Sequence, residues 1–357
     1  MRPRTGLAAI NFFLADVAGG LGPFLATWLA GAAHWSPERV GIVLTVIGLA
    51  GIAFAGPAGA LVDALGCPRL LLALGTLIVA IGTLALLPAR HLAPVLVSQI
   101  AVAAAAALIA PALTALTLGI VGKETFPAQQ GRNQAWNHAG NVVASVLIAW
   151  LAGTIAGISA FWVFSGMALA SGIALLTIRR SDVDIDRARG RTAGAPHVTL
   201  TSVLTDRRVL LVCVGLMMFH LSNAAMLPLL GQRMADVGHG NATRWLAICV
   251  IVAQLTMVGV AAATAWASMR IARSWLFLIP CLVLPVRGAM AAFAWAPEWL
   301  LPIQVLDACG AGLLGVSLPI LIADYTWGSG HTQTALGVAN MFQGVGAALS
   351  TTVGGVL

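Results

Sequence analysis

The sequence predicts an all-α integral membrane protein with eleven membrane-spanning helices arranged in two halves. Of its 357 residues, 59% are hydrophobic and only 9% are charged, whereas about a quarter of an average soluble chain is charged. So little charge does not cover a water-facing exterior. The chain also divides at its polar breaks into apolar runs of about 20 residues, the length that crosses a bilayer as a helix. Lipid is therefore the expected solvent for most of the surface.

Eleven apolar runs carry this prediction. They are residues 7–32, 39–61, 70–88, 93–120, 131–155, 158–178, 209–231, 244–267, 274–296, 298–323 and 333–357. The first run is too long for the apolar part of a cleavable signal peptide, so we interpret it as the first spanning helix. Most breaks between runs are short, and short connections require neighbouring helices to run antiparallel.

One long polar segment divides the chain. Residues 179–208 separate six predicted helices in residues 1–178 from five in residues 209–357. We expect an N-terminal six-helix bundle, a cytoplasmic linker loop and a C-terminal bundle.

The two halves resemble each other in sequence. The fifth run reads GRNQAWNHAGNVVAS and the eleventh reads HTQTALGVANMFQGVG, which matches Asn141 with Asn340. Repeated halves are typical of secondary transporters, whose binding sites lie between the repeats. A counterpart of the sixth run does not follow the eleventh, so we expect twelve helices in the complete fold and a chain truncated before the last.

The basic residues predict the orientation. With a cytoplasmic N-terminus, 14 of the 19 basic residues lie in cytoplasmic segments. One more lies inside a helix, and the opposite side holds Arg39, Arg90, Arg233 and Arg244. This bias is the positive-inside pattern of multi-pass proteins. It predicts a cytoplasmic N-terminus and central loop, and it attributes the net charge of +7 to loops facing lipid, with no nucleic-acid partner. The alanine- and arginine-rich, lysine-poor composition indicates a bacterium, so the inner membrane is the expected location.

No cofactor, metal or catalytic motif is expected. The five cysteines are single and far apart, without the CxxC spacing of a metal site or redox pair. Residues 310–315 match the dinucleotide pattern GxGxxG, but they lie inside an apolar run without a preceding strand. We find no phosphate-binding loop, so ATP is not the expected energy source, and the chain is not expected to be an enzyme.

The loop between the second and third runs carries a family resemblance. It reads GALVDALGCPR, and it resembles the G-x-L-x-D-R-x-G-R-R signature of the major facilitator superfamily at Gly59, Leu61, Asp63 and Gly66. Only Arg69 remains of the expected basic residues. The resemblance implies a two-bundle transporter fold in which Asp63 and Arg69 are gating residues of a cytoplasmic latch. The residues alone also allow a tight turn in which Asp63 caps a helix.

Ionisable groups at membrane depth are candidates for function, because an unpaired charge in hydrocarbon is costly. Asp16 lies about nine residues into the first predicted helix, and His138 lies at a similar depth in the fifth. We expect Asp16, His138 and Asp307 to couple transport to protons. A hydrogen-bonded carboxylate with a structural role alone is the alternative for Asp16.

Asp307 has a second interpretation. The ninth and tenth runs are antiparallel neighbours. Arg287 lies about as far before the outer end of the ninth run as Asp307 lies after the outer end of the tenth. A structural ion pair between Arg287 and Asp307 is therefore as consistent with the pattern as a coupling role.

Amide and imidazole side chains predict the substrate contacts. Asn133, Asn137 and Asn141 recur every four residues, so they share one helix face. The predicted substrate-binding residues are Gln99, Asn137, Asn141, His220 and Asn223. Packing contacts between helices are the alternative role for the amides, and a satisfied core histidine is the alternative for His220.

These observations predict a monomeric transporter that moves a small organic solute by alternating access, with protons and the lipid bilayer as its other partners. Proton coupling is expected through Asp16 and His138. Few fixed charges in the cavity suit a neutral or weakly charged, partly apolar solute, and this cavity character favours efflux. Two alternatives are a proton-independent facilitator and a receptor or assembly factor that keeps the fold without transport.

Overall fold

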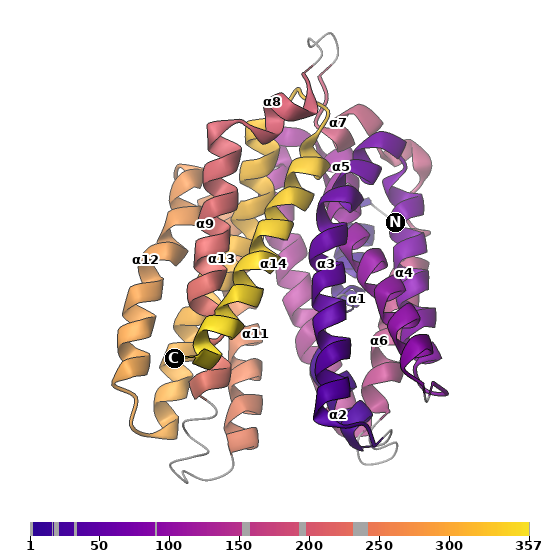
Figure 1. Ribbon diagram of the computed structural model, residues 1–357. Helices are drawn as coiled ribbons and strands as arrows, with labels where there is room; N and C mark the ends of the chain where they lie inside the picture. Colours follow the sequence, from indigo (N-terminus) through magenta and orange to yellow (C-terminus); the bar gives the residue numbers. More distant parts are fainter. Residues whose placement is uncertain are drawn as a thin grey trace.

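A computed structural model describes residues 3–15, 17, 21–31, 34–89, 91–151, 158–192, 198–230 and 242–356. Within these ranges the chain is helical and forms two bundles that lie side by side (Figure 1). The elements of the N-terminal half are α1 (Pro3–Phe13), α2 (Leu21–Gly31), α3 (Pro37–Leu65), α4 (Pro68–Ala85), α5 (Leu92–Leu151) and α6 (Ser159–Leu175). Those of the linker are η1 (Arg180–Asp182), α7 (Ile185–Arg189) and α8 (Leu200–Leu204). Those of the C-terminal half are α9 (Arg207–Asn223), α11 (Ala242–Ala267), α12 (Arg273–Ala292), η2 (Pro297–Trp299), α13 (Leu300–Thr326) and α14 (Thr332–Val356).

Seven of the described helices are long and apolar enough to cross a membrane. They span Pro37–Leu65, Pro68–Ala85, Leu92–Leu151, Arg207–Leu230, Ile248–Ala267, Arg273–Ala292 and Leu300–Thr326. This agrees with a multi-pass membrane protein. The predicted first run is divided between α1 and α2, so the count of eleven stays a prediction.

The 60-residue helix α5 combines two predicted runs. Gly122 lies inside it with φ 70° and ψ 171°, a conformation that glycine adopts easily because it has no Cβ. The kink divides α5 into limbs 92–121 and 123–151. The second limb therefore begins about eight residues earlier than the predicted run at 131. The polar stretch KETFPAQQ conceals this start, because it is helical without being apolar.

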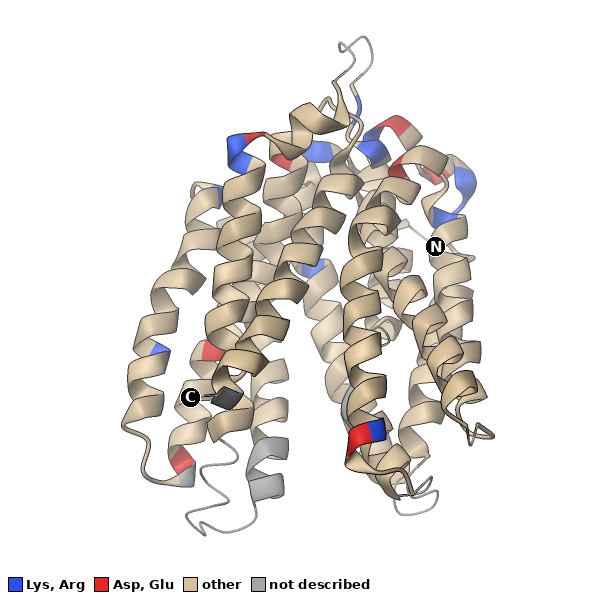
Figure 2. Cartoon of the chain, viewed as in Figure 1, with Lys and Arg blue, Asp and Glu red and all other residues tan. Residues whose placement is uncertain are grey.

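Each half of the chain has its own hydrophobic core. The larger core includes Leu7, Leu72, Leu116 and Phe161 and reaches Ala188 in the linker. A second core contains Leu216, Phe219, Leu321 and Leu336 from the other half. Charged residues gather at the end of the bundles that carries the linker (Figure 2).

The two bundles meet closely where α3 packs against α14. These helices lie together near the linker and diverge toward the opposite end (Figure 1). A Cβ placed on Gly59 of α3 would overlap the backbone carbonyl of Gln333, and one on Gly337 of α14 would overlap that of Ala55. Glycine at both positions therefore allows the two backbones to touch.

This packing predicts opposite effects for two alanine substitutions in α3. Gly59→Ala should lower the free energy of unfolding by about 1–3 kcal/mol, because the added methyl group meets backbone atoms that cannot turn away. Gly41→Ala should be neutral or stabilising by about 0.5–1 kcal/mol, because nothing lies within 4 Å of the added Cβ. Thermal unfolding of the purified variants in detergent measures both. Equal effects at the two positions would contradict the close approach.

Candidate functional site

Asp63 lies at the point where the bundles touch. It is 6% exposed near the end of α3, and it accepts hydrogen bonds from the first turn of α14. The donors are the backbone N–H of Thr334 at 2.7 Å, its hydroxyl at 2.7 Å and the backbone N–H of Gln333 at 3.2 Å. The first N–H groups of a helix have no partner within that helix and carry partial positive charge. Asp63 therefore caps a helix that begins about 270 residues further along the chain.

The linker adds contacts to the same junction. Arg189 of α7 donates to the backbone carbonyl of Ala64 at 2.7 Å, and Gln333 donates to that of Ala188 at 3.0 Å. Outside the linker, Lys123 of α5 adds a contact between the bundles, because its amino group lies 5.4 Å from the ring centroid of Trp327 at the end of α13. Sequence reasoning missed Arg189, because the signature loop gives no sign that a basic residue from the linker returns to it.

Arg69 lies elsewhere, in a pocket between α4, α6 and the linker. Among the described residues no hydrogen bond or ion pair joins Asp63 to Arg69, although the signature loop contains both. Their gating roles stay predictions.

A buried polar cluster joins α9, α12 and α13 in the C-terminal half. A guanidinium nitrogen of Arg287 lies 3.1 Å from a carboxylate oxygen of Asp307, and Arg287 also donates to the side-chain oxygen of Asn223. Asn223 and Gln304 donate to the two carboxylate oxygens of Asp307, at 2.9 and 3.0 Å. The side chain of Arg287 is 1% exposed, whereas that of Asp307 is 14% exposed. The cluster thus leaves the acid more accessible than the base.

His220 stands outside the hydrogen bonds of this cluster. Its Nδ1 lies 3.0 Å from the backbone carbonyl of Leu216, one turn earlier in the same helix. Both His220 and Asn223 were predicted to bind substrate, and the structure joins only Asn223 to the ion pair. Gln304 is a further partner of Asp307 that the sequence analysis did not predict.

The polar stripe of α5 divides between two kinds of contact. Nδ1 of His138 and the amide nitrogen of Asn141 both approach the side-chain oxygen of Gln254 in α11, at 2.9 and 3.2 Å. These contacts join the two bundles. Asn137 instead donates to the backbone carbonyl of Asn11 in α1 at 3.2 Å, within its own bundle.

Gln254 is a further polar residue that sequence reasoning missed. It lies in the run ICVIVAQLTMVGV, where an amide among apolar residues is itself a signal. Asp16, predicted to handle a proton with His138, lies outside the described residues.

A cavity of about 400 Å³ lies between α3, α5 and α14. Its lining is mostly apolar, and Thr83, Gln99 and Asn340 supply polar side chains. Gln99 is 3% exposed, and its amide nitrogen has no hydrogen-bond partner among the described residues. A buried donor without a partner is costly, so a ligand acceptor at this position would be favourable.

The sequence profile of the Major Facilitator Superfamily matches residues 7–351. The chain belongs to the Major Facilitator Superfamily. It is 37% identical over 359 residues to MFS-type transporters of Mycobacterium tuberculosis from strains CDC 1551 and H37Rv, a match that covers 99% of this chain and 86% of each relative. The chain is therefore a membrane transporter by family, and members of this family are not enzymes.

Solved structures of the superfamily share the fold. The transporter FucP in the outward conformation matches with a TM-score of 0.74 at 15% identity, covering 99% of this chain and 91% of that one. The human organic anion transporter MFSD10 matches with a TM-score of 0.68 at 17% identity, covering 98% and 91%. These similarities show the two-bundle superfamily fold.

The capping contact predicts energetic coupling between Asp63 and Thr334. Asp63→Ala and Thr334→Val should each destabilise the transporter, and the double variant should lose about 1.5 kcal/mol less than their sum, because both remove one charge-assisted hydrogen bond. Thermal unfolding in detergent measures the cycle. Thr351→Val on the exposed face of α14 is the control and should be additive with Asp63→Ala. Additivity at Thr334 as well would contradict the cap.

The buried ion pair predicts compensation between two single variants. Arg287→Gln should lower the free energy of unfolding of the protein by about 3–5 kcal/mol, because it leaves the carboxylate of Asp307 without its cation. Adding Asp307→Asn should recover much of this loss, since the pair is then replaced by neutral amides. Yield of monodisperse protein and its midpoint of thermal unfolding measure the recovery. A double variant less stable than Arg287→Gln would contradict the pairing.

Proposed function

We propose that this transporter exports a small, neutral and partly apolar organic solute by alternating access, with coupling to protons. The observation that carries the proposal is the pairing of a buried arginine with a more accessible carboxylate in one bundle. Polar contacts and one apolar cluster, which includes Phe126 and Ile320, join this bundle to the other. Family membership supports transport, and the polar sites support the finer steps.

The contacts between the bundles are the part of the structure that is proposed to open and close during transport. Asp63 and the first turn of α14 form a small hydrogen-bonded contact, and the polar bonds to Gln254 form a second. Such contacts exchange for water when the bundles separate, at a net cost of about 0.5–1.5 kcal/mol per neutral hydrogen bond and about 1.5–3 kcal/mol per hydrogen bond to a charged group. With the predicted cytoplasmic N-terminus, the closed end faces the cytoplasm, as in a neighbour solved in the outward conformation.

Asp307 is the proposed proton carrier of the described residues. Protonation of its carboxylate would leave the buried Arg287 without a counter-ion, and an uncompensated buried charge is strongly unfavourable. The cluster therefore has to rearrange when the proton arrives, which links protonation to movement of α9, α12 and α13. Asp16 and His138 are proposed as a second pair of residues that couple transport to protons, in the N-terminal bundle.

The cavity between α3, α5 and α14 supports the proposed substrate class. Its apolar lining favours burial of hydrocarbon, and Gln99 offers an unpaired donor to one acceptor on the solute. The amide nitrogens of Asn137, Asn141 and Asn223 already donate hydrogen bonds, which have to open before these groups can donate to a solute. These three residues and His220 are therefore proposed to bind substrate at another stage of the cycle.

We further propose that the protein acts as a monomer in the inner membrane. Its eleven spanning helices would divide into bundles 1–178 and 209–357, joined by the cytoplasmic linker 179–208. The main hydrophobic core of each half supports this division, and a smaller apolar cluster joins the two halves.

Proton coupling predicts the outcome of neutralising the carboxylates. In inverted membrane vesicles loaded with a pH-sensitive dye, addition of a transported compound should move protons through the wild-type protein. Asp307→Asn and Asp16→Asn should each lower that flux by about tenfold or more, because the residue that exchanges the proton is gone. A panel of neutral drugs, sugars and organic acids serves to find the compound.

Glu298→Gln is the matched control, because this carboxylate is exposed just before α13. It should leave the flux unchanged. If the wild type and all variants move substrate without any proton flux, the protein is a proton-independent facilitator. Normal flux in Asp307→Asn would exclude the proposed carrier, and no movement of any labelled compound would favour a receptor or assembly factor.

A further inference from the structure

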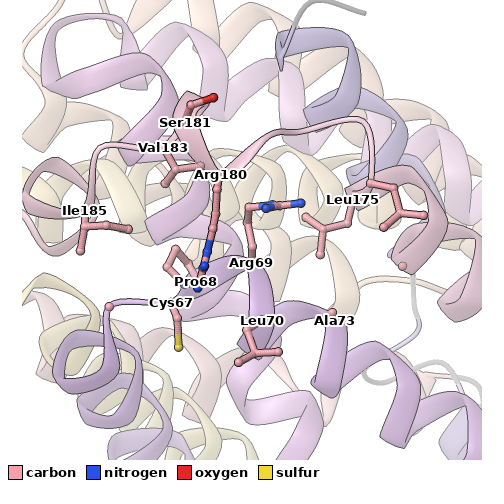
Figure 3. Close-up of a pocket in the computed structure, with 13 residues that line it drawn as sticks. Cys67, Pro68, Arg69, Leu70, Ala73, Leu175, Arg180, Ser181, Val183 and Ile185 are labelled. Carbon is pink, nitrogen blue, oxygen red and sulfur yellow. The ribbon is translucent and has the colours of Figure 1, made fainter.

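A pocket of about 760 Å³ lies at the linker end of the N-terminal bundle, next to the bundle junction, because its lining residue Gly66 lies against Arg189. The start of α4, the end of α6 and the segment from η1 to α7 form its walls. Two arginines line it from different elements, Arg69 from α4 and Arg180 from η1. Figure 3 shows Arg180 extending from the linker toward Pro68, and Arg69 extending from α4 toward Leu175.

We propose that this pocket binds the headgroup of an anionic phospholipid, with its acyl chains along the exposed sides of α4 and α6. The proposal concerns lipid binding and is independent of the transported solute. It commits to a lipid as the occupant, and a soluble phosphate compound is an outcome of the test below.

The charge of the pocket is the first argument. Among the described residues neither Arg69 nor Arg180 forms an ion pair with a carboxylate, whereas Arg187, Arg273 and Arg287 do. Arg69 is half-buried, and its Nε has no hydrogen-bond partner in the described structure. Guanidinium groups bind phosphate oxygens by charge-assisted and often bidentate hydrogen bonds.

The apolar walls are the second argument, because they distinguish a lipid from a free anion. Most of the lining between the arginines is hydrocarbon, from residues such as Pro68, Ala73 and Leu175. The lining continues onto the outer surface of the bundle, where Leu70 is 54% exposed and Leu176 is 75% exposed. A soluble phosphate would leave this surface uncovered, whereas acyl chains would cover it.

The depth of the pocket is the third argument. The spanning helix α4 begins at Pro68, so the lining residues Pro68 and Arg69 lie where an apolar helix meets the membrane–water interface. Lipid phosphates lie at that level, and basic residues in pockets between spanning helices attract anionic headgroups. The position therefore matches the headgroup and its chains at the same time.

Native mass spectrometry of the purified full-length chain tests the proposal. The protein in detergent is titrated with phosphatidylglycerol and, separately, with phosphatidylcholine of the same chain length. Wild type should bind one phosphatidylglycerol with at least about tenfold higher affinity than phosphatidylcholine, the effect expected of basic contacts at an interface. Arg69→Gln combined with Arg180→Gln should remove this preference.

Two further variants separate a built site from general attraction. Ala73→Trp fills the pocket without changing any charge, and it should weaken phosphatidylglycerol binding as much as loss of the arginines. Arg207→Gln with Arg208→Gln removes two exposed charges from the start of α9, outside the pocket, and should keep the preference. Thermal unfolding of each variant checks that it remains folded.

The proposal is overturned if all variants bind phosphatidylglycerol equally, or if the Arg207 and Arg208 control loses binding to the same extent. It is also overturned if soluble glycerol phosphate displaces the lipid at similar concentration, because the site would then recognise a free phosphate. Loss of binding confined to the arginine pair and Ala73→Trp supports it, whatever the vesicle assay shows about transport.

Discussion

The contact between the carboxylate of Asp63 and the first turn of α14 is the constraint on which the arrangement of the bundles depends. It is buried, it joins segments about 270 residues apart, and it satisfies N–H groups that α14 cannot satisfy itself. The backbone approach at Gly59 brings the helices near enough for this cap. Because the linker binds the same place through Arg189, the loop, the linker and the second bundle form one junction.

The polar groups at membrane depth follow a different logic in each half. In the C-terminal half, Arg287 and Asp307 neutralise each other, with Asn223 and Gln304 completing the hydrogen bonds of the acid. In the N-terminal half the α5 stripe contains neutral groups, and part of it joins Gln254 across the bundles. A buried ion pair has to move as a unit, whereas amide bonds between bundles break one at a time at low cost. The first therefore suits coupling, and the second suits a reversible contact.

Local patterns predicted part of the site because they reflect depth and helical spacing. Arg287 and Asp307 were matched by their distance from the helix ends, and the structure places them 3.1 Å apart. Spacing did not show that Asn223 contacts this pair while His220 bonds to its own helix. Spacing also did not indicate the roles of Gln254 and Arg189. The signature loop grouped Arg69 with Asp63, whereas in the described structure Arg69 lines a pocket and forms no hydrogen bond or ion pair with Asp63. The rotation of each helix about its axis, which spacing leaves open, decides such partners.

The sequence by itself determined that lipid surrounds most of the protein, that the fold is helical, and that the chain belongs to a transporter family. The physical reason is that apolar length and charge depletion are properties of each segment alone. Only the tertiary structure decided which helices touch across the bundles, how Gly122 divides α5, and where an unpaired arginine meets an apolar pocket. These features depend on contacts between residues far apart in the chain, and a single sequence does not record which distant surfaces meet.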